Sequence, residues 1–249
     1  MEKYFTINDA GCSVKRKLYF TGRIETVILA AHGFAGNKES NAFHRFADKV
    51  LPKYKNTALL SFDLPCHGED NSPKLTLERC DTYFTLVLNY IRSLPDVKRV
   101  LATAISFGGY LTLKYISEHE NPFEKIALRC PALTMHRLLV NTVMTEDERQ
   151  KLSRVRELPV GFAKKVRITK SFVDELAETD ITQWDFSDYM DTVVIAHGTA
   201  DEIVPYAPVK EFADSNGIDL LSVEGADHRF TDPKKLERAL NEFISFFFA

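Results

Sequence analysis

The chain has 249 residues, of which 45% are hydrophobic and 27% are charged, and its formal net charge is −3. These values are ordinary for a globular protein, and the near-neutral balance argues against a nucleic-acid-binding protein, which would normally carry a basic stripe. A chain of this length can bury a large core, and α/β folds of this size are often one domain. We therefore expect a single domain over residues 1–249.

The cysteines and the apolar runs exclude further classes of protein. The four cysteines are too far apart in sequence to form a CxxC pair, so neither a zinc ribbon nor a thioredoxin-like redox site is expected. The amino-terminal residues lack the apolar stretch of a signal peptide, and the longest apolar run, at Thr26–Ala31, is too short to span a bilayer. These features predict a cytoplasmic protein with reduced thiols and no membrane partner.

Predicted strands and helices alternate along most of the chain. Residues 3–8 and 14–20 are β-rich runs on either side of a turn at 9–11, which predicts a hairpin. Short apolar runs and stretches with helical spacing of apolar residues then follow in turn. The predicted strands are 26–31, 57–62, 100–105, 125–130, 193–197 and 220–223, and the predicted helices are 42–51, 75–94, 108–119, 208–214 and 233–248. This order predicts an α/β fold with a mostly parallel sheet of about eight strands and helices on both faces.

Residues 132–185 interrupt this alternation. They lack clean strands and carry many charges with apolar residues between them, which predicts short helices and loops. In open α/β sheets, ligands bind at the carboxyl ends of the strands, and we expect this segment to form an inserted cap over those ends. Its aromatic residues Phe162 and Trp184 are candidate substrate-binding residues, although Trp184 could equally pack the cap against the core.

A serine in a predicted strand-to-helix turn is the candidate nucleophile. The run Ala104-Ile105-Ser106-Phe107-Gly108 matches the nucleophile-elbow pattern, small-x-Ser-x-Gly. The turn brings the residues two before and two after the serine close together, so small side chains are needed there, and Ala104 stands where glycine is usual. The turn also places Ser106 at the start of a helix, where free N–H groups favour developing negative charge.

A serine hydroxyl needs a base to take its proton, and His228 is the candidate. In this type of site the order along the chain is serine, then an acid, then histidine. His228 follows the last predicted strand, at 220–223, which suits the base. His136 belongs to the expected cap, and His197 precedes the candidate acid, so neither fits the order.

Asp201 is the candidate acid that would hold the His228 ring in the correct tautomer. It follows the carboxyl end of the strand at 193–197. Glu202 and Asp227 are the rival carboxylates. A side chain one residue along from Asp201 normally points elsewhere, and Asp227 is too close to His228 in sequence to reach the far side of its ring.

Two backbone amides are candidates for the oxyanion hole, which stabilises the negative charge of a tetrahedral intermediate. One donor comes from the residue after the nucleophile, here Phe107, and the other from a loop after an early strand. The run His32-Gly33-Phe34-Ala35-Gly36 follows the strand at 26–31, which makes Phe34 the second candidate.

These motifs together resemble the α/β-hydrolase superfamily of serine hydrolases. Within it, His32-Gly33-Phe34 and its small-residue loop resemble bacterial carboxylesterases of the cinnamoyl/feruloyl esterase type. Asp63-Leu64-Pro65-Cys66-His67-Gly68 is similar to the family's Asp-x-x-Gly-His-Gly segment, with cysteine where glycine is usual. His197-Gly198-x-x-Asp201 and Val204-Pro205 match the acid loop. The resemblance runs from Thr26 to the end of the chain and is weakest in 132–185.

The sequence therefore predicts a serine hydrolase that cleaves a small or aromatic acyl ester with Ser106, Asp201 and His228. A thioesterase, an acyltransferase or a peptidase could use the same residues, and the chain leaves no room for the large gating domain of a peptidase. A hydrolase-like binding protein would normally lack one of the three residues. The expected partner is a small-molecule ester, and the oligomeric state stays open.

Neither a cofactor nor a metal ion is expected. His32, His67 and His197 each precede a glycine at a predicted strand end, which raises the question of a metal site. They are well separated in sequence and lack carboxylate partners in a ligand pattern, so hydrogen bonds to loop backbone are the expected role. Phe246, Phe247 and Phe248 are expected to pack a closing helix on the sheet rather than to anchor the chain in a membrane.

Overall fold

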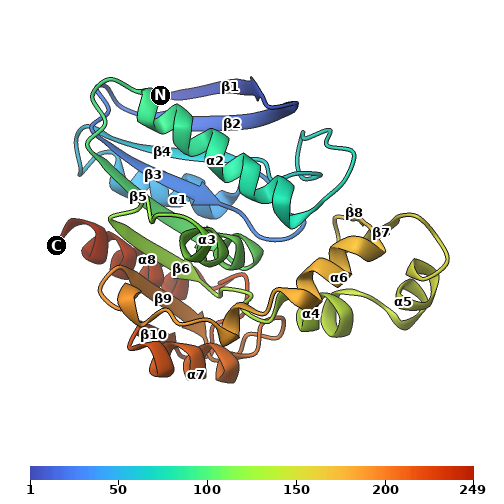
Figure 1. Cartoon of the computed structure of the whole chain (residues 1–249). Coiled ribbons are helices and arrows are strands. Elements are labelled where there is room, and N and C mark those ends of the chain that lie inside the picture. Colours follow the sequence, from blue (N-terminus) through green and yellow to red (C-terminus); the bar gives the residue numbers. More distant parts are fainter.

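The computed structural model describes residues 1–249, and its central feature is an eight-stranded sheet (Figure 1). The strands lie in the order β1-β2-β4-β3-β5-β6-β9-β10, with β1 and β2 antiparallel at one edge and parallel pairing from β4 to β10. The mostly parallel sheet predicted from the sequence is confirmed. The strands are β1 Glu2–Asp9, β2 Cys12–Phe20, β3 Thr26–Ala31, β4 Thr57–Phe62, β5 Arg99–Ile105, β6 Lys125–Arg129, β9 Val193–Gly198 and β10 Asp219–Val223.

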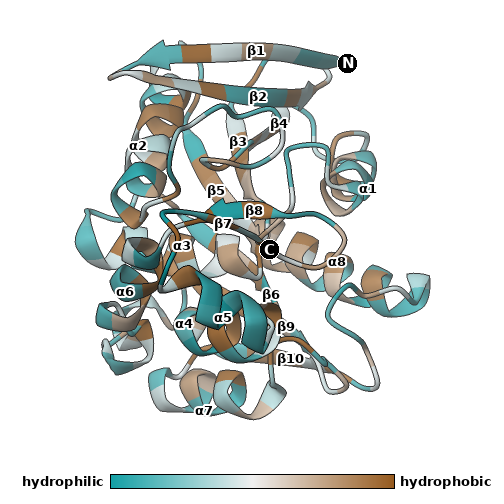
Figure 2. Cartoon of the chain, turned by 90° about the vertical axis from the view of Figure 1, so that its right-hand side faces the viewer, coloured by the Kyte–Doolittle hydropathy of each residue, from teal (hydrophilic) through white to brown (hydrophobic).

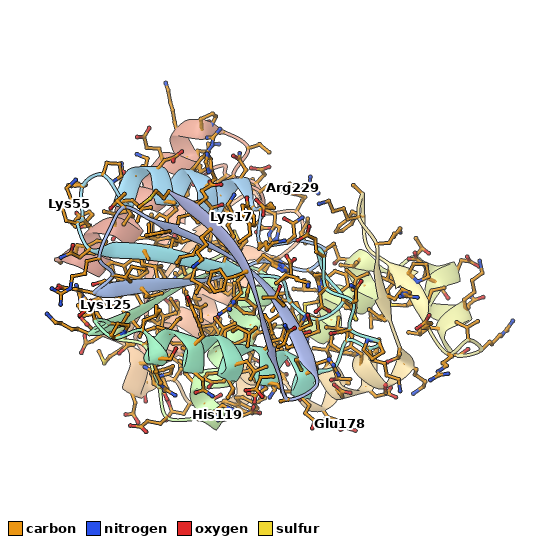
Figure 3. The ribbon with its side chains drawn as sticks, turned by 90° about the horizontal axis from the view of Figure 1, so that it is seen from above. Lys17, Lys55, His119, Lys125, Glu178 and Arg229 are labelled. Atoms are coloured by element: carbon orange, nitrogen blue, oxygen red, sulfur yellow. The ribbon has the colours of Figure 1, made fainter.

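Helices cover both faces of the sheet because its central strands are apolar on both sides. Every residue of β3 and β4 is buried, which explains why these strands read as continuous apolar runs rather than alternating ones. One face packs against α1 Asn41–Val50 and α8 Pro233–Phe248, and the other against α2 Leu77–Ser93, α3 Phe107–Glu118 and α7 Tyr206–Asn216. Figure 3 shows the exposed residues Lys55 and His119 at the outside of these layers.

The segment of residues 132–185 lies between β6 and β9 and projects from the carboxyl ends of the strands (Figure 1). Its surface is largely hydrophilic, most evidently along α5 (Figure 2). The expectation of helices and loops alone was wrong, since β7 and β8 pair as an antiparallel hairpin of three residues a strand. The segment contains α4 Met135–Leu138, a π-helical turn Leu139–Val143, α5 Glu146–Leu152, β7 Leu158–Val160, β8 Val166–Ile168, α6 Lys170–Glu178 and a 3-10 turn Ile181–Gln183.

The closing helix and the cysteines are both packed into the fold. Phe247 is fully buried in the core, and the ring of Phe248 stacks on Tyr54 with their centroids 3.7 Å apart. None of the helices combines the length and the apolar character needed to cross a bilayer. All four cysteines are free thiols, and only Cys66 is more than slightly exposed.

Candidate functional site

Ser106 occupies the strained turn between β5 and α3. Its backbone has φ 54° and ψ −117°, a left-handed conformation that side chains other than glycine rarely adopt and that costs about 1–3 kcal/mol. The surrounding backbone holds it there: the Ser106 amide donates to the Arg129 carbonyl at 3.0 Å, and the Ser106 carbonyl accepts from the amides of Ala132 and Tyr110. The turn therefore presents the serine at the carboxyl end of the sheet.

The spacing of small residues around Ser106 has a direct steric cause. A Cβ atom on Gly108 would lie 2.4 Å from the Ala31 carbonyl oxygen and 2.6 Å from that of His32. Such contacts are far too short, so the start of α3 can approach β3 this closely only with glycine at this position. On the other side of the serine, a Cβ atom on Gly33 would lie 3.1 Å from the Ser106 Cβ. The elbow and the loop after β3 are thus in close contact.

The structure brings His228 and Asp201 together across two loops. Asp201 Oδ2 lies 2.8 Å from His228 Nδ1, while Asp201 Oδ1 accepts the amides of Ile203 and Val204 at 2.9 and 2.8 Å. Burial alone would raise the pKa of the fully buried Asp201 carboxyl, but hydrogen bonds from His197 and His228 outweigh burial and hold this pKa well below its usual range. An ionised carboxylate only accepts, so Nδ1 of His228 carries the proton and Nε2 is the free basic nitrogen.

The rival residues lie nearby but hold other positions. The Glu202 side chain accepts the backbone amide of His228 at 3.3 Å, and Asp227 accepts the amide of Thr231 at 2.8 Å. Neither touches the His228 ring. His197 supports Asp201 instead, since its Nε2 lies 3.0 Å from the Val204 carbonyl oxygen and 3.3 Å from Asp201 Oδ2. His136 lines a separate small cavity.

His32 and His67 are buried beneath the loop after β3. The Leu64 amide donates to His32 Nε2 at 3.1 Å, so the proton sits on Nδ1 and is donated to the Gly33 carbonyl at 2.8 Å. Burial, together with the positive charge of Lys164, lowers the pKa of His32 to about 4 despite that bond. Burial also lowers the pKa of His67 to about 3, with a further contribution from His32. Both rings are therefore neutral near pH 7.

The two oxyanion-hole candidates belong to the two segments that meet at the elbow, the loop after β3 and the start of α3. Phe107 is the first residue of α3, so its amide has no acceptor within the helix. The Phe34 amide, in the loop after β3, donates no hydrogen bond to a backbone carbonyl. The two phenyl rings meet edge to face with centroids 6.1 Å apart, which fixes the loop after β3 against the start of α3. Both amides are free to donate to a substrate.

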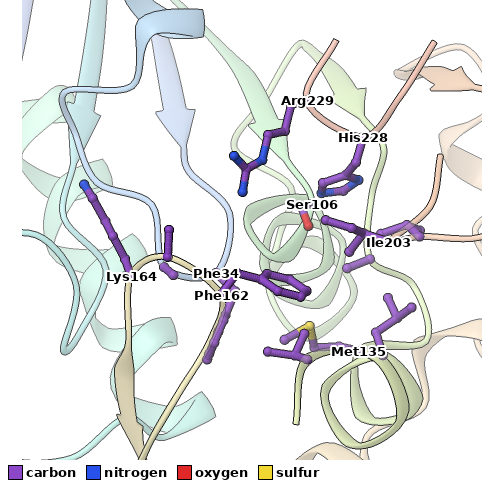
Figure 4. Close-up of a pocket in the computed structure, with 14 residues that line it drawn as sticks. Phe34, Ser106, Met135, Phe162, Lys164, Ile203, His228 and Arg229 are labelled. Carbon is purple, nitrogen blue, oxygen red and sulfur yellow. The ribbon is translucent and has the colours of Figure 1, made fainter. Parts of the chain in front are cut away.

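A cavity of about 320 Å³ opens beside Ser106 and His228, and both residues line it (Figure 4). Of the two substrate-binding candidates, Phe162 lines this cavity and Trp184 does not. Trp184 packs against the core instead. The sequence analysis missed several lining residues, among them Met135, Lys164, Ile203 and Arg229. The only sequence signals are that Arg229 directly follows the candidate base and that Ile203 lies in the acid loop, two residues after Asp201.

Two groups of residues have the atoms of a metal site. In the more exposed group of Asp81, Glu118 and His119, the His119 Nε2 atom already lies 2.7 Å from Asp81 Oδ1. In the second group, ligand atoms of Cys130, His197 and Asp201 all lie within 4.8 Å of one another. Burial raises the pKa of the Cys130 thiol well above its usual value, which disfavours the thiolate that binds metal ions. Asp201 is already engaged by His228 and by two backbone amides. These residues are better suited to supporting the Asp201 carboxylate than to holding an ion.

Comparison with known proteins identifies the family of the chain and solved structures with the same fold. Residues 27–239 match the model of the alpha/beta hydrolase family. No curated protein shows significant sequence similarity to the chain. Est1E from Butyrivibrio proteoclasticus, solved with ferulic acid bound, superposes with a TM-score of 0.78 at 19% identity over 98% of this chain and 97% of that one. Alpha/beta hydrolase domain-containing protein 10 from mouse gives a TM-score of 0.71 at 16% identity over 98% of both chains. A serine hydrolase without a lid from Xanthomonas campestris gives 0.62 at 11% identity over 98% and 90%.

Proposed function

The chain belongs to the alpha/beta hydrolase family, and from this premise we propose that it is a serine hydrolase that cleaves carboxylic esters. The observation that carries the proposal is the buried Asp201 carboxylate, which lies 2.8 Å from Nδ1 of a histidine that lines the same cavity as the strained Ser106. This arrangement supports a histidine base with its free nitrogen toward a serine nucleophile.

In the first half of the proposed reaction, Ser106 Oγ attacks the ester carbonyl carbon and its proton passes to His228 Nε2. The carbonyl oxygen becomes an oxyanion that accepts hydrogen bonds from the Phe34 and Phe107 amides. One such donor is typically worth about 3 kcal/mol of barrier. The intermediate then collapses, the bond to the leaving oxygen breaks, and His228 gives its proton to the departing alcohol. The acyl group remains on Ser106 as an ester.

In the second half, water replaces the alcohol. His228 Nε2 takes a proton from water as its oxygen attacks the acyl carbon, and the same two amides stabilise the second oxyanion. Collapse breaks the bond to Ser106 Oγ, which recovers its proton from His228, and the carboxylic acid leaves. Asp201 stays ionised throughout and stabilises the charged form of the ring.

The cavity supports an ester with a small or aromatic acyl group. Its volume is about 320 Å³ and ten of its 14 lining residues are hydrophobic, which suits a compact apolar group. Est1E, which shares the fold, was solved with ferulic acid, an aromatic acid. We assign residues 132–185 as the cap that closes this cavity, because Met135, Leu138 and Phe162 of that segment all line it.

A fluorophosphonate probe tests the proposal directly. The probe phosphorus reacts with an activated serine oxygen and fluoride leaves, so the label should map to Ser106 and be absent from Ser106→Ala. The same variant should lose about 10⁶-fold in kcat on 4-nitrophenyl acetate. The proposal fails if the folded protein takes up no label, if peptide mapping places the label elsewhere, or if Ser106→Ala retains full activity.

A further inference from the structure

Two positively charged residues line the cavity and come from different parts of the fold. The lining contains no aspartate or glutamate, yet it includes Lys164 and Arg229. Lys164 belongs to the loop between β7 and β8, and Arg229 directly follows His228. Both side chains are exposed, so water reaches them as well as the cavity. The charge at the rim of this mostly apolar cavity is therefore positive.

The charged groups around Lys164 are already paired with one another. Lys165 lies 3.3 Å from Glu148, and Lys38 binds both Asp63 and Glu69. Lys164 itself forms no ion pair or hydrogen bond within the chain, in contrast to these neighbours. Its ammonium group therefore has no protein partner.

The acids around Arg229 are engaged in the same way. Asp201 binds the His228 ring, Glu202 accepts the His228 amide, and Asp227 accepts the Thr231 amide. The Arg229 guanidinium forms no ion pair or hydrogen bond within the chain. Its five donors are thus available to a ligand, and a guanidinium suits the two oxygens of a carboxylate or a phosphate.

Arg229 and part of the apolar lining lie on different sides of the serine. Figure 4 shows Arg229 on one side of Ser106 and Met135 and Ile203 on the other, while the ammonium end of Lys164 points away from Ser106. A substrate centred on Ser106 would therefore meet apolar side chains at one end and positive charge at the other. Such a site selects a substrate whose apolar end fits the apolar side chains and whose charged end is negative.

We propose that the substrate of the proposed hydrolase site carries an anionic group, a carboxylate or a phosphate, that is bound by Arg229, with Lys164 adding positive charge at the rim, while an apolar portion occupies the side of Met135 and Ile203. This inference rests on the hydrolase function and specifies its substrate class. A second, polar cavity of about 700 Å³ shares Ala35 and Lys164 with the first. The anionic portion therefore has room to extend beyond the two cations.

Matched esters test the charge preference. The measured quantity is kcat/KM for two sets of esters. The first set contains phenyl hexanoates whose ring carries a carboxylate, a phosphate or, as the neutral counterpart, the methyl ester of the carboxylate. The second set contains 4-nitrophenyl hydrogen adipate and its neutral methyl ester. The first set places the charge on the alcohol portion and the second on the acyl portion. We expect one anionic ester to exceed its neutral counterpart by about tenfold, since a hydrogen bond to a charged group is typically worth that much or more. The preference should shrink as salt is added.

The variants Arg229→Gln and Lys164→Met should each lower this anionic-to-neutral ratio, and the double variant should bring it near one. Arg238→Gln is the matched control, because it removes an exposed positive charge from α8, away from the cavity. It should leave the ratio unchanged. A ratio near one in the wild type, or one that survives the double variant, overturns anion recognition even if the neutral esters are hydrolysed.

Binding to Ser106→Ala keeps the inference testable whether or not any of these esters is cleaved. Calorimetry with the carboxylate-bearing, phosphate-bearing and neutral phenyl hexanoates, and with 4-nitrophenyl hydrogen adipate and its methyl ester, should give a Kd about tenfold lower for an anionic ester than for its neutral counterpart. Arg229→Gln in the same background should reduce this difference. Equal affinities of anionic and neutral esters in both sets would overturn anion recognition. Absence of turnover combined with this affinity difference would instead overturn only the hydrolase function.

Discussion

The loops at the carboxyl ends of the central strands and the segment of residues 132–185 meet at one cavity but are built differently. Asp201 is fully buried among hydrogen bonds, and Ser106 is held in a strained conformation by backbone contacts on both sides. Phe162 and Lys164 lie on an exposed loop between two three-residue strands. The difference suggests a division of roles, in which the sheet fixes the reacting groups and the segment shapes what reaches them.

Among the substitutions that distinguish the two regions, the largest expected change in kcat concerns Asp201, in the loops at the carboxyl ends of the strands. Asp201→Asn should leave the fold intact but lower kcat by about 10⁴, because the amide favours the wrong tautomer of His228. Initial rates on 4-nitrophenyl acetate, with circular dichroism to verify folding, measure the change. Glu202→Gln is the control, since Glu202 touches only the backbone amide of His228, and its loss should stay below about tenfold. Equal losses in the two variants would reassign the acid.

A smaller effect is expected on the exposed side of the cavity. Phe162→Ala should change relative kcat/KM between short-chain and aromatic acyl esters by about ten- to two-hundredfold, because one pocket contact discriminates by about 1–3 kcal/mol. Nitrophenyl acetate, which is too small to fill the cavity, should be nearly unaffected. Trp184→Ala, outside the cavity, should leave the selectivity unchanged. A parallel fall for all esters in Phe162→Ala would mean that the segment affects the reacting groups themselves.

The last effect concerns the free energy of unfolding, and it tests the buried side of the cavity alone. The pKa of His67 is lowered to about 3 by burial, and that of His32 to about 4. The unfolded chain therefore binds protons below about pH 6.5 that the folded chain excludes, so the free energy of unfolding should fall as pH drops from 6.5 toward 4. Each histidine contributes a slope of about 1.4 kcal/mol per pH unit.

Urea unfolding at several pH values measures that slope. His67→Gln keeps a donor for the Pro65 carbonyl but removes the titrating group, so the slope between pH 6 and 4.5 should become shallower by about 1.4 kcal/mol per pH unit. An unchanged slope would show that His67 binds protons equally in the folded and unfolded states, and the lowered pKa of the buried His67 would be wrong.

The sequence predicted those parts of the structure that depend on residues close together in the chain. The strands β3, β4 and β5 are short and mostly apolar, and the turn at Ser106 needs small neighbours at fixed spacing. Both features can therefore be recognised in the sequence alone. The pairing of Asp201 with His228 was also predicted, because each residue follows a strand end and those ends converge at one edge of a parallel sheet. Their catalytic roles stay predictions.

The segment of residues 132–185 could not be predicted in the same way. Its two strands have three residues each and include Pro159 and Arg167, so no alternating pattern is long enough to stand out. The position of Trp184 depends on tertiary packing, which composition does not reveal. Lys164 and Arg229 look like ordinary surface charges in the sequence, and only the folded chain shows that they border a cavity.

The free thiols described above make the chain suitable for site-specific spectroscopic labelling. Cys12, Cys80 and Cys130 are buried, and burial raises the pKa of Cys66 to about 11. The thiolate is the form that reacts with maleimides, so at pH 7 only about one Cys66 side chain in 10⁴ is reactive. A single cysteine introduced at exposed Ala163 would react far faster than the native thiols. A fluorophore or spin label there would report on the surroundings of the β7–β8 hairpin, because Ala163 lines the cavity beside Ser106.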